Sequence, residues 1–344
     1  MTDYEKIIKA VRAIAKNELP DIDISEILRE HKCLYFLAVL KKSDHEIMFN
    51  KFVITERYKA CATVFEEMRN IPYAVIKGAV LSKAAYGDIV YRKSGDIDLL
   101  VSRDNADKIT AVMRNNGFIQ GRITEEGIVP FTRQEILFHS ALTHQTAPFV
   151  KKTENMLCPY VQVDINMDIL WGEQKEKFDM GYILSKTLQT NICGVTVYKL
   201  SPVMEFISLC LHHYKDMNSI YLLSKGSLKL YLFCDIYYYL HNNNVDISEL
   251  TEECDKLNIT EYIYYCVYYA DMIFGGGKLD GYLSVLKNGK AESILDTFGL
   301  SGNERKKWPI SFFERLFSDR FFEIFNNLLD EEDIKKIRKN ISFM

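Results

Sequence analysis

Two aspartates one residue apart, Asp96 and Asp98, are the residues of this chain whose types and spacing best suit catalysis. They lie in an apolar run that continues to Val101. Side chains alternate between the two faces of a strand, so we expect both carboxylates on one face, with Ile97 and Leu99 turned into the core. Two carboxylates held this close repel each other, and their pKa values rise unless a cation neutralises them. A hard divalent ion that prefers oxygen ligands, Mg²⁺ above all, is the expected partner.

A further carboxylate is expected in residues 161–169. If the aspartate pair belongs to a site for two divalent ions, a third acidic ligand is usually needed. Residues 161–169 alternate apolar and polar side chains with period two, which predicts a half-buried strand. The polar face of this strand carries Asp164 and Asp168, and both are candidates for the third ligand.

The elements that must position the first two aspartates lie just upstream. Their order resembles the DNA polymerase β-type nucleotidyltransferase superfamily, in which a strand, a glycine-containing turn and a short helix precede a strand with Asp-x-Asp. Here the corresponding segments are residues 73–76, 81–86 and 97–101. The closer similarity is to a bacterial branch of uncharacterised nucleotidyltransferases, whose pattern is Lys-Gly, a helix ending in Tyr, an Arg, then Asp-Ile-Asp-Leu-Leu-Val. The matching residues are Lys77, Gly78, Tyr86, Arg92, Asp96 and Asp98.

The resemblance implies an α+β fold. A polymerase β-type nucleotidyltransferase core, a mixed sheet with flanking helices, is expected over residues 71–200. A helical N-terminal region is expected over residues 1–70 and a helical C-terminal domain over residues 201–344. Within these regions, apolar spacing predicts helices over residues 52–68 and 105–116.

Three further segments outside these helices carry expectations. Residues 121–159 contain apparent β segments with His139 and His144, which would lie on opposite faces of a shared strand and are expected to be structural or surface residues. Residues 275–277 are three glycines, predicted to form a turn between helices rather than a phosphate loop. Residues 318–344 are predicted to form an amphipathic helix with a charged end.

The sequence departs from the family pattern at two positions. Ala79 stands where the wider superfamily has Ser or Gly, so backbone N–H groups at the start of the helix would have to hold a phosphate without a side-chain hydroxyl. In the family the third acidic residue lies on a later strand, commonly with His two residues on. Asp164 takes the acidic place, and Asn166 stands at the position of the His. The resemblance therefore favours Asp164 over Asp168.

The resemblance implies a metal-dependent nucleotidyltransferase that moves an NMP from an NTP, with ATP favoured, to a hydroxyl or phosphate of an acceptor, releasing pyrophosphate. Asp96, Asp98 and Asp164 would hold two Mg²⁺ ions, for which Mn²⁺ can substitute. The acceptor hydroxyl attacks the α-phosphorus in line. Two alternatives stay open: an inactive nucleotide-binding or partner-binding module of the same fold, and a toxin-like enzyme that modifies tRNA or a protein.

Four residues near the turn and one in the C-terminal region are candidates for binding the nucleotide. They are Lys77, Gly78, Ala79, Arg92 and Lys229. The C-terminal candidate is assigned by a family element, Leu-x-x-His at Leu209 and His212, followed by a basic residue and Asp235. The alternatives are that Lys77 and Arg92 pair with the carboxylates or carry solvated charge, and that Lys229 pairs with Asp235 or extends into solvent.

Composition narrows the acceptor and the compartment. The formal charge is 43 minus 47, or −4, over 344 residues, without a long basic run. This disfavours nucleic acid as acceptor and favours a small molecule, a peptide or a protein. Eight scattered cysteines without a Cys-x-x-Cys pattern predict free thiols in a reducing compartment and no cysteine zinc site. The N-terminus lacks an apolar signal core, and residues 228–240 are interrupted by charges, so we expect a cytoplasmic protein without membrane association.

Overall fold

The computed structural model describes residues 2–142, 145–170, 178–226, 228–300, 302 and 304–341. The chain forms two compact units, and each is assembled from separate stretches of sequence. The first, which we call the sheet unit, comprises Ser43–Leu209 and Tyr238–Val245. The second, which we call the helical unit, comprises Met1–Lys42, Cys210–Tyr237 and Asp246–Met344.

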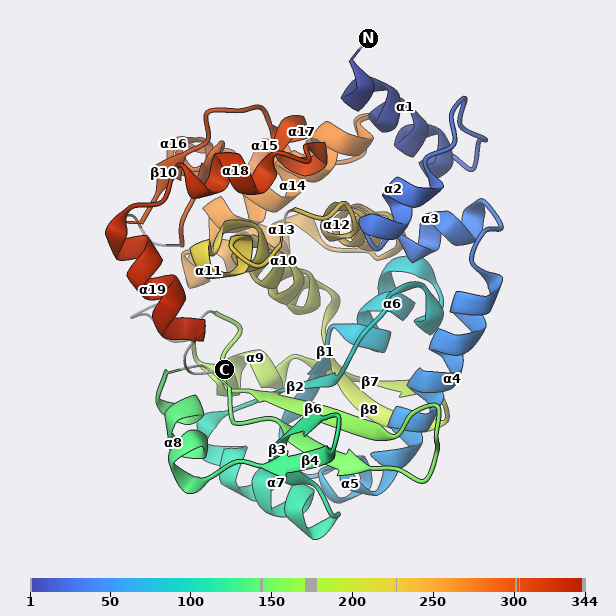
Figure 1. Ribbon diagram of the computed structural model, residues 1–344, viewed down its shortest axis with the longest axis vertical. Helices are drawn as coiled ribbons and strands as arrows, with labels where there is room; N and C mark the ends of the chain where they lie inside the picture. The colour runs from blue at the N-terminus through green and yellow to red at the C-terminus, as the bar shows by residue number, and fades with distance from the viewer. Residues whose placement is uncertain are drawn as a thin grey trace. The chain divides into compact units, whose positions relative to one another are not determined.

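A mixed six-stranded sheet organises the sheet unit (Figure 1). Its strands are β1 (Tyr73–Ile76), β2 (Ile97–Val101), β3 (Ile119–Thr124), β4 (Gly127–Pro130), β5 (Phe149–Lys152) and β6 (Tyr160–Asn166). Their order across the sheet is β1-β2-β6-β5-β3-β4. Strands β2 and β6 are parallel, and the other neighbouring pairs are antiparallel. The predicted α+β class with a mixed sheet is confirmed, and β1 and β2 have the predicted bounds.

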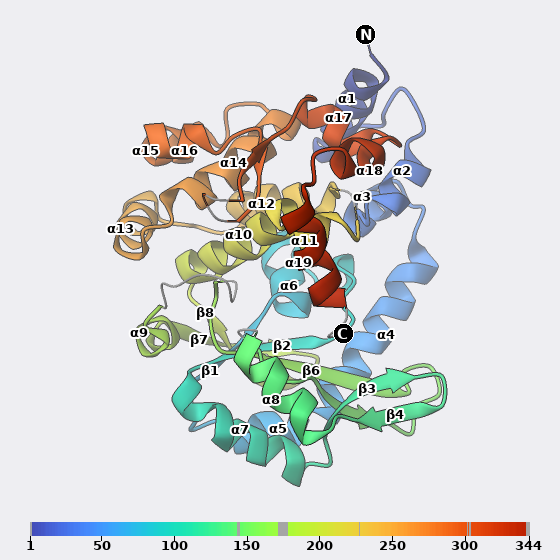
Figure 2. The same cartoon turned by 60° about the vertical axis from the view of Figure 1, so that its left-hand side comes forward.

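Helices cover both faces of this sheet. Figures 1 and 2 show α5 and α7 beneath the sheet and α6, which directly follows β1, on the other side. The remaining elements of the unit include a β-ribbon of β7 and β8, whose second strand lies beside β1. The elements are α4 (Asp44–Ala60), α5 (Ala62–Glu67), α6 (Gly78–Tyr86), the 3₁₀ helix η1 (Ile89–Tyr91), α7 (Arg103–Asn115), α8 (Arg133–Leu142), α9 (Met180–Ser185), β7 (Thr187–Ile192) and β8 (Val195–Leu200).

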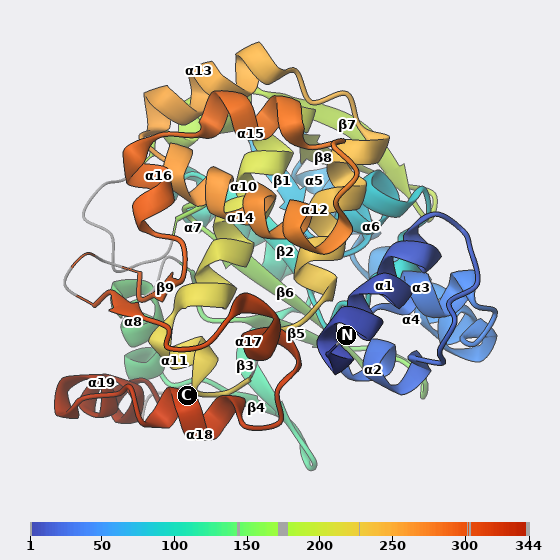
Figure 3. The ribbon, with the colours of Figure 1, turned by 90° about the horizontal axis from the view of Figure 1, so that it is seen from above.

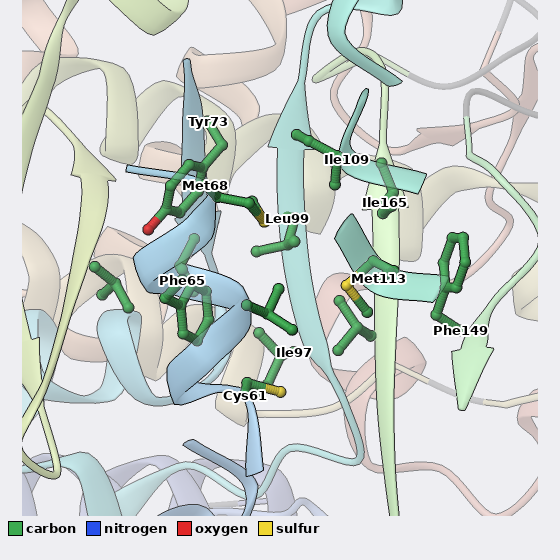
Figure 4. Close-up of a cluster of buried hydrophobic side chains, with 14 of the residues drawn as sticks. Cys61, Phe65, Met68, Tyr73, Ile97, Leu99, Ile109, Met113, Phe149 and Ile165 are labelled. Carbon is green, nitrogen blue, oxygen red and sulfur yellow. The ribbon is translucent and has the colours of Figure 1, made fainter. Parts of the chain in front are cut away.

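The core of the sheet unit lies between the sheet and helices α5 and α7. Figure 4 shows Ile97 and Leu99 of β2 and Ile165 of β6 directed toward Phe65 of α5 and Met113 of α7. All five side chains are buried. Because alternate strand residues face opposite sides, burying the isoleucines and leucine here directs the side chains of the intervening residues to the opposite face. This is the arrangement that the alternation around the Asp-x-Asp pair predicts.

The helical unit packs aromatic residues between its helices. The ring of Tyr214 in α10 lies 4.6 Å from that of Tyr262 and 5.1 Å from that of Tyr265, both in α14. Arg12 of α1 donates to the carbonyl groups of Met272 and Ile273 at the end of α14, which satisfies acceptors that a helix terminus leaves open. Figure 3 shows α13, α15 and α16 grouped around α14.

The helical unit contains eleven complete helices, two short strands and parts of two longer helices among its described residues. Helices α10 (Pro202–Asn218) and α12 (Tyr231–Asn242) each contribute residues to both units. The others are α1 (Asp3–Ala15), α2 (Ser25–Glu30), α3 (Leu34–Val39), α11 (Ile220–Leu223), α13 (Ile247–Leu257), α14 (Thr260–Phe274), α15 (Asp280–Leu286), α16 (Gly289–Ser293), β9 (Thr297–Phe298), β10 (Lys306–Lys307), α17 (Phe312–Phe317), α18 (Phe321–Asn326) and α19 (Glu331–Ile341).

Four predicted helix and strand assignments differ from the structure. The helix predicted over residues 81–86 begins earlier, at Gly78. The helix predicted over residues 52–68 begins earlier, at Asp44, and is divided at Cys61 into α4 and α5. The strand predicted over residues 161–169 ends at Asn166. The C-terminal helix predicted over residues 318–344 is two helices, because Asp330 starts a new one by accepting a hydrogen bond from the Asp333 N–H.

The histidine expectation in residues 121–159 is also corrected. His139 lies in helix α8, not in a strand, and its ring lies 5.3 Å from that of Phe131. His144 lies outside the described residues. The period of the apolar residues in this stretch is irregular, so a ten-residue helix inserted between β4 and β5 left no clear helical signal.

Two simpler predictions are confirmed. The eight cysteines are all free, and seven of them are buried. Gly275, Gly276 and Gly277 connect α14 to α15 with positive φ angles of 58°, 86° and 72°, as expected of a turn. Among the residues that the structure describes, no helix has both the length and the apolar character needed to cross a membrane.

Candidate active site

The parallel pairing of β2 with β6 brings together carboxylates that are distant in sequence. Asp98 of β2 lies directly opposite Asp164 of β6 in the register of the two strands. Asp96 lies one residue before β2 and interacts electrostatically with both of the other carboxylates. The structure therefore gathers Asp96, Asp98 and Asp164 at one place on the sheet.

Asp98 is held by two side-chain donors. The Lys77 ammonium donates to Asp98 Oδ1 over 3.1 Å, and only 15% of the lysine side chain and 9% of the aspartate side chain are exposed. Asn166 Nδ2 donates to the same oxygen over 3.2 Å and to the Leu99 carbonyl over 3.3 Å. Gln145 in turn donates to Asn166 Oδ1 over 2.7 Å. Asn166 is thus a buried residue that orients Asp98, a role that sequence reasoning missed.

Asp96 is supported from a different direction. The Ser94 hydroxyl donates to the Asp96 carbonyl over 2.8 Å and lies 3.2 Å from its Oδ1. The Arg57 guanidinium of α4 donates to the Ser94 carbonyl. Its positive charge opposes the rise that burial causes in the pKa of Asp96. Ser94 stands next to the motif and could have been suspected for that reason. Arg57 lies nearly forty residues upstream on another element, and the sequence carries no signal that links it to the site.

Two of the three carboxyl groups, those of Asp96 and Asp164, have raised pKa values. Burial, and then the charges of Asp96 and Asp98, raise the pKa of Asp164 to about 7, although Gln162 donates to it over 3.0 Å. Burial and the charge of Asp98 also raise the pKa of Asp96, against the opposing effect of Lys77. A bound cation would favour the charged forms of Asp96 and Asp164 and would therefore stabilise this site.

The turn between β1 and α6 has an unusual backbone beside these carboxylates. Lys77 has φ 59° and ψ −150°, a conformation that residues other than glycine rarely adopt. Gly78 follows with φ 47° and begins α6, and a Cβ added to it would lie 3.4 Å from Ser94 Oγ. No described side chain caps this helix start, so the first-turn N–H groups are available to an anion. The hydroxyl that is missing at Ala79 is present nearby, on Ser94.

The other predicted residues are placed as follows. Asp168 lies beyond the end of β6, where its Oδ1 accepts from the Leu170 N–H over 3.0 Å. Burial raises the pKa of Asp168, and the nearby cation is Arg103 rather than Lys77. Asp164, and not Asp168, lies opposite Asp98 in the strand register, and its role as the third metal ligand stays a prediction.

Arg92 and Lys229 are the two remaining candidates for binding the nucleotide. Arg92 follows η1, and its carbonyl accepts a hydrogen bond from Asn50 over 3.3 Å. Lys229 belongs to the helical unit, where its ammonium lies 3.6 Å from Glu30 Oε1. Asp235, the alternative partner of Lys229, instead has its Oδ2 3.1 Å from His213 Nε2. The roles of Arg92 and Lys229 toward a nucleotide remain predictions.

Comparison with known proteins identifies the family of the chain. A family model described as uncharacterised nucleotidyltransferase matches residues 25–275, and the chain belongs to this family. The resemblance predicted from the Lys-Gly and Asp-x-Asp motifs is confirmed at the level of the family. No curated protein matches the chain. Among solved structures, it is similar to an antigenic nucleotidyltransferase-like protein from Paracoccidioides brasiliensis, with 16% identity, a TM-score of 0.33, and coverage of 64% of this chain and 93% of that chain.

Proposed function

We propose that this protein is a divalent-metal-dependent nucleotidyltransferase of the polymerase β type, which moves an NMP from an NTP to an acceptor and releases pyrophosphate. The observation that carries the proposal is the meeting of Asp96, just before β2, with Asp98 of β2 and Asp164 of the adjoining β6, next to the open N-terminus of α6. Family membership supports nucleotidyl transfer in general. The metal dependence, the nucleotide and the acceptor are the additional claims of the proposal.

The donor set fits hard divalent ions. Three carboxylates supply oxygen ligands of the kind that Mg²⁺ and Mn²⁺ prefer. Burial and mutual repulsion raise the pKa values of Asp96 and Asp164, so a cation at the site relieves an existing electrostatic cost. We assign two Mg²⁺ ions to these carboxylates, with Mn²⁺ able to substitute. Bound there, the ions supply neutralisation of the triphosphate and a lowered pKa for the acceptor hydroxyl.

The residues of the chain have separate tasks in this proposal. Asp96 and Asp98 hold the triphosphate side of the site, and Asp164 holds the side from which the acceptor approaches. The N–H groups of Gly78 and Ala79 bind phosphate oxygens at the start of α6. The Lys77 ammonium, which neutralises Asp98 in the absence of ligand, passes to a phosphate when the nucleotide binds. Positioning and charge compensation of this kind supply most of the rate of phosphoryl transfer.

Other parts of the proposal rest on composition and on the resemblance. ATP is the favoured nucleotide, and Arg92 and Lys229 are further candidates for contacts with it. The net charge of −4 favours a small molecule, a peptide or a protein as acceptor over nucleic acid. The resemblance to a bacterial branch and the free thiols of all eight cysteines support a bacterial, cytoplasmic setting.

A second candidate function is a nucleotide-binding module without turnover. Two observations favour it: Lys77 already compensates Asp98, and Asn166 occupies the position at which the family commonly has a histidine. A binding module would need the phosphate cradle but not the full set of carboxylates. The intact set of three carboxylates favours the enzyme.

The test is incubation with α-labelled NTPs, Mg²⁺ or Mn²⁺ and a crude extract as the source of acceptor. An Asp96→Asn/Asp98→Asn double variant is run beside the wild type, and Asp168→Asn is the matched control, because it neutralises a half-buried carboxylate outside the cluster. Transfer of label by wild type and Asp168→Asn but not by the double variant supports the enzyme. Equal transfer by all three contradicts it. Thermal stabilisation by NTP that requires metal, without any transfer, favours the binding module.

A further inference from the structure

A second group of possible metal ligands lies on α10, within the helical unit. The residues His212, His213 and Asp216 each offer one ligand atom, and these three atoms all lie within 4.8 Å of one another. His212 and Asp216 are four residues apart, so they share a face of the helix. Their side chains are 19% and 25% exposed, whereas the His213 side chain is fully buried.

The distance between two of these atoms matches metal coordination. His212 Nε2 lies 3.3 Å from Asp216 Oδ2. Two donors that each lie about 2.0–2.1 Å from a tetrahedral Zn²⁺ are about 3.4 Å apart. The pair is therefore already spaced as two corners of a coordination tetrahedron, and the third donor, which lies within 4.8 Å of both, needs a shift of at most about 1.4 Å to join it.

An independent observation concerns the buried histidine. His213 Nε2 lies 3.1 Å from Asp235 Oδ2, and that carboxylate is itself 1% exposed. The other ring nitrogen of His213, Nδ1, is buried without a hydrogen-bond partner in the described part of the chain. Leaving a buried polar nitrogen unsatisfied is costly, and such atoms are rare in native proteins.

The partner of His213 resembles the support of a metal-ligating histidine. Such a histidine usually donates one ring N–H to a carboxylate, which fixes the tautomer and leaves the lone pair of the other nitrogen for the ion. With the proton on Nε2 directed at Asp235, the unsatisfied His213 Nδ1 is the nitrogen that carries the lone pair. A bound cation would satisfy the one polar atom of this ring that the protein leaves unpaired.

We propose that His212, His213 and Asp216 bind one transition-metal ion of the Zn²⁺ class, with Asp235 as the positioning residue of His213. Two imidazoles and one carboxylate select Zn²⁺ over Mg²⁺, in contrast to the three carboxylates on the sheet. Three protein ligands leave a fourth position to water or a ligand, and the partial exposure of His212 and Asp216 gives access to it. The site stands independently of nucleotidyl transfer.

The test measures Zn²⁺ binding directly. The full chain is stripped with EDTA, desalted and titrated with Zn²⁺ against a chromophoric chelator in excess Mg²⁺, and the retained metal is measured by elemental analysis. His212→Ala and Asp216→Ala alter a partly exposed helix face, and circular dichroism confirms their folding. His45→Ala, at an exposed histidine of α4, and Asp96→Asn/Asp98→Asn are the controls.

The expected result is one equivalent of Zn²⁺ that excess Mg²⁺ does not displace. His212→Ala and Asp216→Ala should each weaken binding by at least about 10-fold, and Asp235→Asn by about 10–100-fold, as for other residues that support metal ligands. Both control variants should bind like wild type. The proposal is overturned if the wild type retains no Zn²⁺ at micromolar free metal, if both ligand variants bind as tightly as wild type, or if only the Asp96→Asn/Asp98→Asn variant loses the ion.

Discussion

Lys77 Nζ and Asp98 Oδ1 lie 3.1 Å apart, and the lysine that makes this contact has a backbone conformation rarely seen outside glycine. Such a conformation costs about 1–3 kcal/mol and persists only where the surrounding structure enforces it. The same residue thus begins the phosphate cradle and neutralises a proposed metal ligand. We infer that Lys77 alternates between Asp98 and a phosphate, and this inference leads to the first prediction.

Lys77→Met should separate metal binding from transfer. Methionine has a similar length and the same backbone penalty, but it removes the charge that competes with a cation for Asp98. We expect Mg²⁺ to bind the free variant more tightly, by about 3-fold or more, since one nearby positive charge at partial burial is worth at least that much. The transfer rate should fall by about 100-fold or more, because a charged group that contacts the phosphates is lost.

Thermal-shift titration with Mg²⁺ and a rate assay with labelled NTP measure the two effects separately. Lys83→Met is the control and should change neither, because Lys83 lies in α6 just after Lys77 but its ammonium donates to the Asn191 carbonyl. Weaker Mg²⁺ binding by Lys77→Met would show that the lysine does not compete with the ion.

The raised pKa of Asp164 predicts how stability depends on pH. In the unfolded chain this carboxyl ionises near pH 4, but in the folded protein its pKa is about 7. The folded state therefore holds a proton that the unfolded state has released, and the free energy of unfolding of the metal-free protein falls as the pH rises from about 4 to about 7. Asp164→Asn removes this contribution. The fall in the free energy of unfolding between about pH 4 and about pH 7 should therefore be smaller in the variant, by on the order of 2–4 kcal/mol.

Urea unfolding at pH 5 and pH 8 in EDTA checks this prediction. Mg²⁺ should restore stability to the wild type at pH 8 much more than at pH 5, because its ligands must be deprotonated. Asp164→Asn should be at least as stable as wild type at pH 8 although it is inactive. Parallel pH profiles for the two proteins would mean that Asp164 ionises normally.

Gly78→Ala should lower activity by more than its effect on stability explains. The φ angle of 47° makes any L side chain there strained, and the new Cβ would lie 3.4 Å from the Ser94 hydroxyl that supports Asp96. Gly87→Ala is a matched control, since Gly87 ends the same helix with φ 83° and has open space around it. We expect both variants to lose about 1 kcal/mol of stability.

Only Gly78→Ala should reduce transfer, by about 10-fold or more, because a small displacement of catalytic groups is costly. Denaturant unfolding and the labelled-NTP assay give the two quantities. An equal loss of activity in both glycine variants would indicate a general weakening of the helix rather than a specific role for this turn.

The sequence predicted the local parts of this site well. Strands β1 and β2 have the expected bounds, since their apolar runs are short and bounded by turn residues, and Ile97 and Leu99 face the core as the alternation requires. The carboxylates Asp96 and Asp98 follow from the same pattern. The resemblance to a known family then extended the prediction to Asp164, more than sixty residues away.

Two of the supporting residues, Arg57 and Asn166, could not be predicted, because their roles depend on long-range packing. Arg57 reaches Ser94 from a helix on another part of the sheet unit, and Asn166 reaches Asp98 only because β6 pairs in parallel with β2. A single sequence contains no information on which strand will be the neighbour. The family comparison even pointed away from Asn166, because it stands where a histidine is common.

The most direct test of the central claim is the rate of label transfer from an α-labelled NTP by single variants of the three clustered carboxylates. The account predicts that Asp96→Asn, Asp98→Asn and Asp164→Asn each reduce Mg²⁺-dependent transfer by about 100-fold or more, whereas Asp168→Asn retains most of the wild-type rate. If Asp164→Asn retained transfer and Asp168→Asn lost it, Asp168 would be the third ligand and the assignment of Asp164 would be wrong. Undiminished transfer in all four variants would contradict the proposed active site altogether.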